Sequence, residues 1–234
     1  MKKRLLCLLS VITVVAILIP GGTALAFDSK IMNRISYEYA HVNWIDNIDI
    51  DPDGPGPELP DGIFDRFAII NLDVNKTDEG TNVYFNVTVY DTPYFNQTPG
   101  NQWPPPMGRE WGNTFTTEDV FSLVGKKVLT GATLSSVTIP LQNNFDPPRP
   151  IRTVTLQTDW TALGTLYTSS TRGQYTSGDT TTKYSEATEN IQATPSGTLT
   201  FNPPPPIAPP SRPIPAYANG NIGTYERTET IMNR

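Results

Sequence analysis

The amino-acid sequence predicts an all-β protein, an antiparallel β-sandwich of the immunoglobulin or jelly-roll type with few short helices. Residues 82–90 alternate strictly between apolar and polar side chains, which is the period of a half-buried strand. Threonine, valine and tyrosine dominate most of the other periodic stretches, and these residue types favour pleated positions. Glycine- and proline-rich stretches separate them, as expected between short strands.

In chain order, strands are expected at residues 35–44, 67–74, 82–90, 132–139, 151–160 and 198–201. Residues 76–80 join the second and third strands as a hairpin loop, with Gly80 supplying a conformation that other residues resist. Only residues 117–129 have the features of a short helix, because Thr116 or Thr117 can cap it and acidic residues occupy its first turn.

Three segments interrupt this pattern. Residues 92–113 contain five prolines and three glycines and are expected to form a long loop. Residues 164–185 are rich in Thr, Ser, Gly and Tyr; we favour a pair of exposed strands there over a mobile loop. Residues 202–215 should form a polyproline-II strip, which either ends the domain or leads to a last strand at residues 216–230.

The N-terminus has the features of a cleavable secretory signal peptide over residues 1–26. Lys2, Lys3 and Arg4 precede an apolar run over residues 5–19, and Ala24-Leu25-Ala26 supplies the small-residue cleavage pattern. The run is shorter than the roughly 20 residues that a bilayer span needs. We therefore expect a secreted or cell-surface protein without a membrane span after cleavage.

The domain organisation follows from these boundaries. A β-sandwich domain is expected over residues 27–201, with a possible division into two sub-domains near residues 145–150. The proline-rich strip at residues 202–215 and a terminal strand or tail at residues 216–234 come after it. Sequence alone leaves open whether residues 202–234 belong to the fold.

Composition excludes several partners and chemistries. Removing the signal peptide takes three basic residues and no acidic ones, so the net charge changes from −6 to −9. A chain this acidic is poorly suited to nucleic acid or to anionic lipid surfaces. The single cysteine, Cys7, lies within the signal peptide, so the remaining chain has neither a disulfide framework nor a thiol nucleophile.

A dense acidic run stands between the first two predicted strands. Residues 46–65 contain seven Asp and Glu residues and no Lys or Arg. These like charges repel one another, so a compact arrangement needs a compensating cation. Asp49, Asp51 and Asp53 alternate and precede Gly54, as in the first half of an EF-hand calcium loop. The alternative is a solvated acidic loop built from turn-forming residues.

The pattern then departs from the EF-hand, because Pro60 stands where the closing Glu would lie and no helices flank the loop. It resembles instead the helix-less calcium loops of secreted archaeal and bacterial β-sandwich surface modules, in a match over residues 36–91 that includes the run from Asp61 to Phe67. The resemblance implies a calcium-rigidified sandwich without enzymatic activity. The candidate calcium ligands are Asp49, Asp51, Asp53, Glu58, Asp61 and Asp65.

Catalytic motifs are scarce. His41 is the only histidine, which excludes a multi-histidine metal site, and no Gly-x-Ser-x-Gly elbow accompanies it, so a structural role is favoured. Neither a dinucleotide-binding glycine motif nor a phosphate loop occurs. Paired-carboxylate glycoside hydrolysis is the one common mechanism that composition does not exclude.

We therefore predict a secreted or cell-surface, non-enzymatic β-sandwich protein, stabilised by calcium, with a structural or adhesive role toward an unknown surface or matrix partner. One alternative is a carbohydrate-binding or glycan-active module that uses exposed tryptophans such as Trp103 and Trp111. A second alternative is a subunit of an extracellular filament assembled by strand exchange. The source organism and the oligomeric state do not follow from the sequence.

Overall fold

A computed structural model of the chain describes residues 30–48, 66–91, 106–125, 128–146, 148–204 and 210–233. These residues form eleven β-strands and no helix. The strands are β1 (Lys30–Ile48), β2 (Arg66–Thr77), β3 (Gly80–Asp91), β4 (Gly108–Thr116), β5 (Phe121–Val124), β6 (Gly131–Pro140), β7 (Gln142–Asn143), β8 (Thr153–Ser177), β9 (Thr180–Asn202), β10 (Ser211–Pro213) and β11 (Asn219–Asn233).

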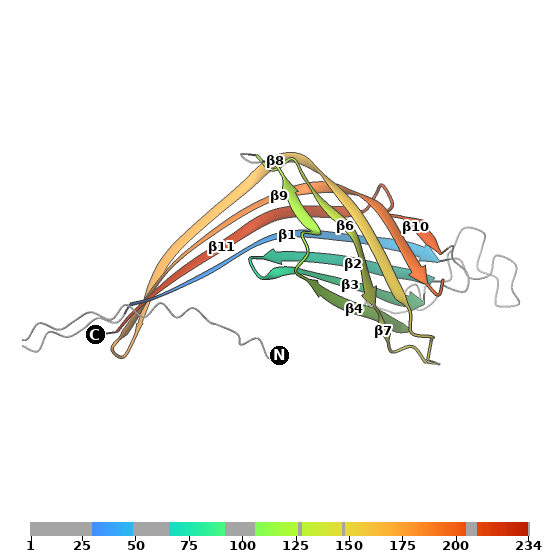
Figure 1. Ribbon diagram of the computed structural model, residues 1–234, viewed down its shortest axis with the longest axis horizontal. Helices are drawn as coiled ribbons and strands as arrows, with labels where there is room; N and C mark the ends of the chain where they lie inside the picture. The colour runs from blue at the N-terminus through green and yellow to red at the C-terminus, as the bar shows by residue number, and fades with distance from the viewer. Residues whose placement is uncertain are drawn as a thin grey trace, which may run out of the picture.

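The strands belong to one antiparallel sheet, in the order β5-β6-β8-β9-β11-β1-β2-β3-β4-β7, with β10 paired to β9. The sheet folds over on itself, so that β5, β6 and the first half of β8 pass in front of β2, β3 and β4 (Figure 1). Contacts between the two layers agree with this arrangement: the rings of Phe85 on β3 and Phe201 on β9 lie 6.2 Å apart. The all-β, antiparallel, sandwich-like fold that the sequence predicts is thus confirmed.

The core lies between the two layers and follows the strand period. On β2 and β3 the inward side chains are fully or almost fully buried: Ala68, Ile70, Leu72, Val74, Val83, Phe85 and Val89. Directly paired residues such as Leu72 and Phe85 share one face of the sheet, because opposite residues of an antiparallel ladder point the same way. The alternation that predicts these strands is therefore also the pattern of burial.

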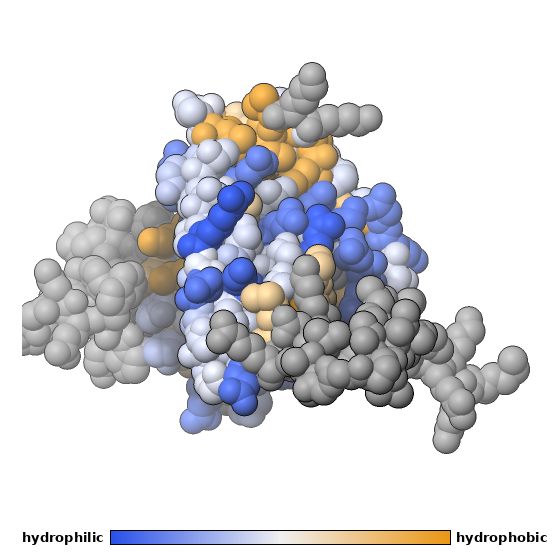
Figure 2. Space-filling model, turned by 90° about the vertical axis from the view of Figure 1, so that its left-hand side faces the viewer, coloured by the Kyte–Doolittle hydropathy of each residue, from blue (hydrophilic) through white to orange (hydrophobic). Residues whose placement is uncertain are grey.

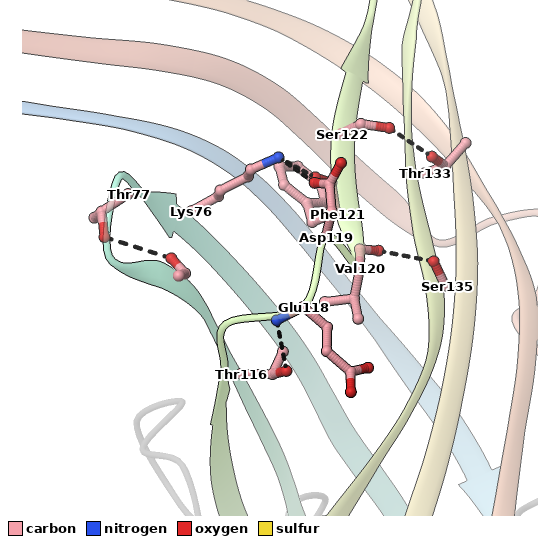
Figure 3. A network of polar contacts seen from close by, with 11 residues as sticks. Lys76, Thr77, Thr116, Glu118, Asp119, Val120, Phe121, Ser122, Thr133 and Ser135 are labelled. Carbon is pink, nitrogen blue, oxygen red and sulfur yellow. Dashed lines mark hydrogen bonds and ion pairs between the residues drawn. The ribbon is translucent and has the colours of Figure 1, made fainter.

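The helix expected at residues 117–129 is wrong for the residues that the structure describes there. The Thr116 hydroxyl accepts a hydrogen bond from the Glu118 N–H at 3.1 Å, which makes a tight turn instead of a helix cap (Figure 3). The chain then forms β5, and Phe121 is buried against Trp160, with ring centroids 6.2 Å apart. Burial of an inward-facing aromatic side chain on a strand overrides the local helix signal.

The same segment is held to the neighbouring layer by Lys76 at the end of β2. Its ammonium donates to the Asp119 carboxylate at 2.6 Å and to the Phe121 carbonyl at 2.8 Å (Figure 3). The Ser135 hydroxyl donates to the Val120 carbonyl at 3.1 Å from the other side. These three hydrogen bonds satisfy backbone or side-chain oxygens where the β4–β5 connection enters β5.

Two other boundaries differ from expectation. The loop predicted at residues 92–113 is shorter, because Gly108–Thr116 forms β4 and pairs with β3. A Cβ at Gly112 would lie 2.2 Å from the Pro140 carbonyl oxygen. Glycine at this position therefore permits the close approach of β4 to β6. Within the proline-rich segment, Ser211–Pro213 is not a free strip but forms β10 against β9.

Four strands run beyond the sandwich as an extension that we call the arm: residues 30–39 of β1, 164–177 of β8, 180–190 of β9 and 223–233 of β11. In Figure 1 the arm projects to the left of the sandwich, and the β8–β9 turn lies at its tip. The preference for strands at residues 164–185 is confirmed. Within the described residues, no helix is long and apolar enough to cross a membrane.

Candidate functional site

The six predicted calcium ligands, Asp49, Asp51, Asp53, Glu58, Asp61 and Asp65, lie outside the described residues. The strand ends that bracket them are described, and Ile48 pairs with Arg66 in register. The acidic residues therefore belong to the connection between two adjacent antiparallel strands. Asp46, the first acidic residue of the run, forms an ion pair with Arg212 of β10, so a distant part of the chain supplies one compensating cation.

His41 forms one side-chain contact in the part of the chain that the structure describes. Its Nδ1 lies 2.6 Å from Oδ1 of Asp73, on the outer face of the sheet, and both side chains are partly exposed. Its own backbone carbonyl accepts a hydrogen bond from the Trp160 indole at 3.2 Å. An imidazole oriented by a carboxylate is two parts of a catalytic triad, but no serine hydroxyl among the described residues is hydrogen-bonded to it.

A buried ion pair joins the two layers of the sandwich. Glu110 on β4 is 1% exposed, and Oε2 of its carboxylate accepts a hydrogen bond from Nε of Arg152 at 2.9 Å and another from the Arg152 NH2 group. The guanidinium also lies 4.9 Å from the centroid of the Phe201 ring. Oε1 of Glu110 has no hydrogen-bond partner among the described residues. One buried carboxylate held by an arginine fits a structural brace between layers.

The three described tryptophans do not form one exposed surface. Trp44 and Trp160 are buried in the core. Trp111 lies on β4 with the Arg109 guanidinium 4.5 Å from its ring centroid, and Trp103 lies outside the described residues. The two buried rings stabilise the sandwich and are not available to stack on a sugar.

The arm has two chemically different faces. The pairing register puts one group of side chains on a single face, which we call the tyrosine face. It carries six tyrosines and three isoleucines: Tyr37, Tyr39, Tyr167, Tyr175, Tyr184, Tyr225, Ile31, Ile35 and Ile231. The opposite face carries mainly Thr, Ser and charged residues, together with Met32, Ala187 and Met232. Apart from β2, which pairs with β1 from Glu38 onward at the base of the arm, no other strand of the described chain pairs with the arm.

The four inner tyrosines have partners within the arm. Tyr37 and Tyr225 stack, with ring centroids 5.0 Å apart. Tyr39 covers Gly223, where an added Cβ would lie 2.6 Å from the phenolic oxygen, and Tyr184 covers Gly173 in the same way at 2.5 Å. At each of these two glycines, the absence of a side chain leaves room for an aromatic ring from the adjacent strand.

The charged side chains of the tyrosine face are paired with one another. The Arg227 guanidinium donates to Glu186 at 2.6 Å and to Glu229 at 2.9 Å, and it lies 5.4 Å from the Tyr184 ring centroid. Burial raises the pKa of Tyr39 above its ordinary value, and the neighbouring Tyr37 raises it further. The face therefore combines aromatic surface with internally paired charges.

Sequence reasoning predicted strands in this region but missed the arm as a site. A signal was present, because Tyr37 and Tyr39, and likewise Tyr167 and Tyr175, are separated by even numbers of residues and so share a face of their strand. Which of the described strands adjoin to form the arm depends on long-range pairing. In comparisons with known proteins, no family model, curated protein or solved structure matches this chain.

Proposed function

We propose that this is an exported, non-enzymatic protein with a structural or adhesive role at or outside the cell surface, and that the arm is the part that contacts its partner. The observation that carries the proposal is the arm itself. It consists of four long strands that project from the sandwich and cover nothing else in the described chain.

Its residue types support a role in contact. Aromatic residues are enriched in the cores of protein interfaces, where large and rigid side chains supply contact area at a low entropic cost. The tyrosine face is of this kind, and its charged residues are already paired with one another. The expected signal peptide at residues 1–26 would deliver the arm to the extracellular space.

A cross-linking experiment in the native host tests this function. A photo-reactive benzoylphenylalanine is placed at Ile35, on the tyrosine face, and in a second strain at Ile151, which is exposed on the sandwich. On illumination, discrete adducts with a neighbouring macromolecule should form from position 35 and not from position 151. Adducts from position 151 alone, or from neither position, would contradict a contact role for the arm.

We also propose that calcium binds the connection between β1 and β2 and stabilises the fold. The alternation of Asp49, Asp51 and Asp53 before Gly54 supports this proposal, as does the pairing of Ile48 with Arg66, which confines the acidic residues to one strand connection. Binding to the folded state alone adds about 2.7 kcal/mol to the free energy of unfolding when calcium exceeds its Kd a hundredfold.

Calorimetry tests the calcium site. Adding millimolar calcium to the chelated protein should raise Tm, and magnesium should act more weakly because it requires tighter octahedral geometry. The Asp49→Asn, Asp51→Asn double variant should lose the response, and relief of like-charge repulsion should leave its metal-free Tm equal to or above that of the wild type. A wild-type Tm that does not change with calcium would rule out the site.

The glycan alternative has less support, because two of the four tryptophans are buried. It predicts that soluble polysaccharides quench tryptophan fluorescence, which separates it from the structural role. The strand-exchange filament is the remaining alternative. This alternative requires an unpaired strand edge, and it predicts that the protein forms open polymers.

A further inference from the structure

We propose that the partner of the arm is a second copy of this chain. The two copies pair along the free edges of β8, about a two-fold axis that passes between the two Thr171 residues. This inference rests on the proposed contact role of the arm and specifies its partner. The result would be a closed dimer in which the two arms form one continuous eight-stranded antiparallel sheet.

The outer edge of β8 is open along the arm. β6 pairs with β8 only between Thr153 and Thr161, whereas β9 pairs along the other edge as far as Ser177. The backbone groups that point outward from residues 164–177 therefore have no strand partner in the described chain. An unpaired edge of this kind is a template for another strand.

This edge lacks the features that usually prevent such pairing. Residues 164–177 contain no proline and a single charged residue, Arg172. The irregularity in the β8–β9 register lies between Leu163 and Tyr167, so the rest of the strand is regular up to the turn. The opposite edge of the arm, on β1, is open over fewer residues, because β2 pairs with β1 from Glu38 onward, and this edge carries the exposed Arg34. Edge charges, prolines and bulges protect against edge pairing, and the β8 edge has the least protection.

The two tyrosines of this edge are also the ones without a partner. Tyr167 is 66% exposed and Tyr175 is 55% exposed. Neither makes a ring contact or a side-chain hydrogen bond with any described residue, whereas Tyr37, Tyr39, Tyr184 and Tyr225 all have neighbours within the arm. The unsatisfied aromatic surface therefore coincides with the unsatisfied backbone edge.

The spacing of these tyrosines selects the register. A two-fold axis perpendicular to the sheet, at Thr171, places Tyr167 of one copy opposite Tyr175 of the other, and it does so twice. Arg172 then faces Ser170 of the second copy, so no like charges oppose each other. Moving the axis to Arg172 would set the two arginines against each other, which is unfavourable for directly opposed residues. Aromatic cross-strand pairs stabilise antiparallel sheets.

The register also keeps the sandwiches apart. Antiparallel pairing sends the two arms in opposite directions, so each sandwich lies beyond the tip of the other arm. The β8–β9 turn of one copy, at Gly178, would then approach the base of the other copy's arm, where Leu163 is exposed beside Gly164. Val124 and Val128, in or next to the β5–β6 connection, are exposed too. Figure 2, which looks onto the arm side of the molecule, shows hydrophobic residues gathered at the top of this view.

Disulfide trapping tests the register directly, because the chain after residue 26 contains no cysteine. In that protein, Thr171→Cys should form an intermolecular disulfide under mild oxidation, since the two Cα atoms of directly opposed strand residues lie about 4.5–5.5 Å apart. Thr176→Cys is the matched control. It lies on the same edge, but its counterpart in the second copy is ten residues along the ladder, roughly 33 Å away, so it should stay reduced.

Sedimentation measures the same association without oxidation. One strand edge buries less surface than the standard interface of about 1,600 Å², so dimers should form in the micromolar range or above. The Tyr167→Lys, Tyr175→Lys double variant should raise the dimer Kd at least about tenfold, because it replaces two aromatic pairs with opposed like charges. Met32→Lys, on the opposite face at the other edge, should leave it unchanged.

The outcomes are separable. A wild type that stays monomeric at hundreds of micromolar, open polymers in place of dimers, or equal trapping at positions 171 and 176 would each overturn the two-fold pairing. A monomer whose arm still cross-links to another macromolecule in the host would preserve the proposed function while removing the second copy as its partner.

Discussion

The two halves of β8 differ in environment although they belong to one continuous strand. From Thr153 to Trp160 the side chains alternate regularly between inward and outward, and Val154, Leu156, Thr158 and Trp160 are buried. From Gly164 to Ser177 almost every side chain is exposed. The first half has β6 beside it and the opposing layer above it, and the second has only β9. Burial is therefore set by which strands lie nearby, and the arm is ordered mainly by its ladder of backbone pairs.

The largest expected contrast is between side-chain truncations in the two regions. Phe85→Ala removes a fully buried ring that lies beside Phe201, and it should lower the free energy of unfolding by about 3–5 kcal/mol. Met32→Ala on the arm should change it by no more than about 0.5 kcal/mol, because its side chain is already exposed. Urea unfolding measures both. Similar losses at the two positions would show that the arm has a buried face.

Breaking the brace between the layers should cost about as much. Arg152→Met leaves the Glu110 carboxylate buried without its cation, which should lower stability by about 3–5 kcal/mol. Adding Glu110→Leu in the same chain should restore most of this loss, because apolar residues of similar volume often replace a buried ion pair without cost. A double variant as unstable as the single one would mean that the pair positions the two strands.

Hydrogen exchange should separate the two halves of β8 at the level of the backbone. Amides between Thr153 and Trp160 should exchange only through global unfolding, whereas those of the arm should exchange through local opening at a much lower free energy. In the monomeric protein, obtained by dilution, the arm should show little protection beyond that of an isolated four-stranded sheet. Equal protection along the whole strand would contradict the comparison.

The smallest effect concerns alkaline pH. Because burial raises the pKa of Tyr39, the folded state holds the phenolic proton more tightly than the unfolded state. The stability from this group is present below the ordinary tyrosine pKa of about 10 and is lost as the pH rises through the folded value. Absorbance titration should show one fewer high-pH tyrosine in Tyr39→Phe, and the alkaline loss of arm protection should be smaller in that variant.

Several strands could be identified from residue patterns alone. The alternation around Val83 and Phe85 predicts a strand and also its buried face. The helix at residues 117–129 could not be excluded in this way, because the signals at Thr116 and Glu118 are local, and what decides the conformation is the burial of Phe121 beside Trp160. The predicted limits of the loop at residues 92–113 were wrong at β4 for the same reason, since Gly112 belongs to a strand because it pairs with Phe85 of β3.

The sequence by itself determined the all-β class, the antiparallel sandwich and the single histidine that excludes a multi-histidine site, because period, residue type and count are properties of the chain alone. The tertiary structure alone decided that β1, β8, β9 and β11 adjoin, that six tyrosines share one face, and that the β8 edge is left open. Pairing between residues as distant as Tyr37 and Tyr225 depends on the closure of long loops and on the packing of the whole sheet. The local residue pattern carries no information about loop closure or about the packing of the whole sheet.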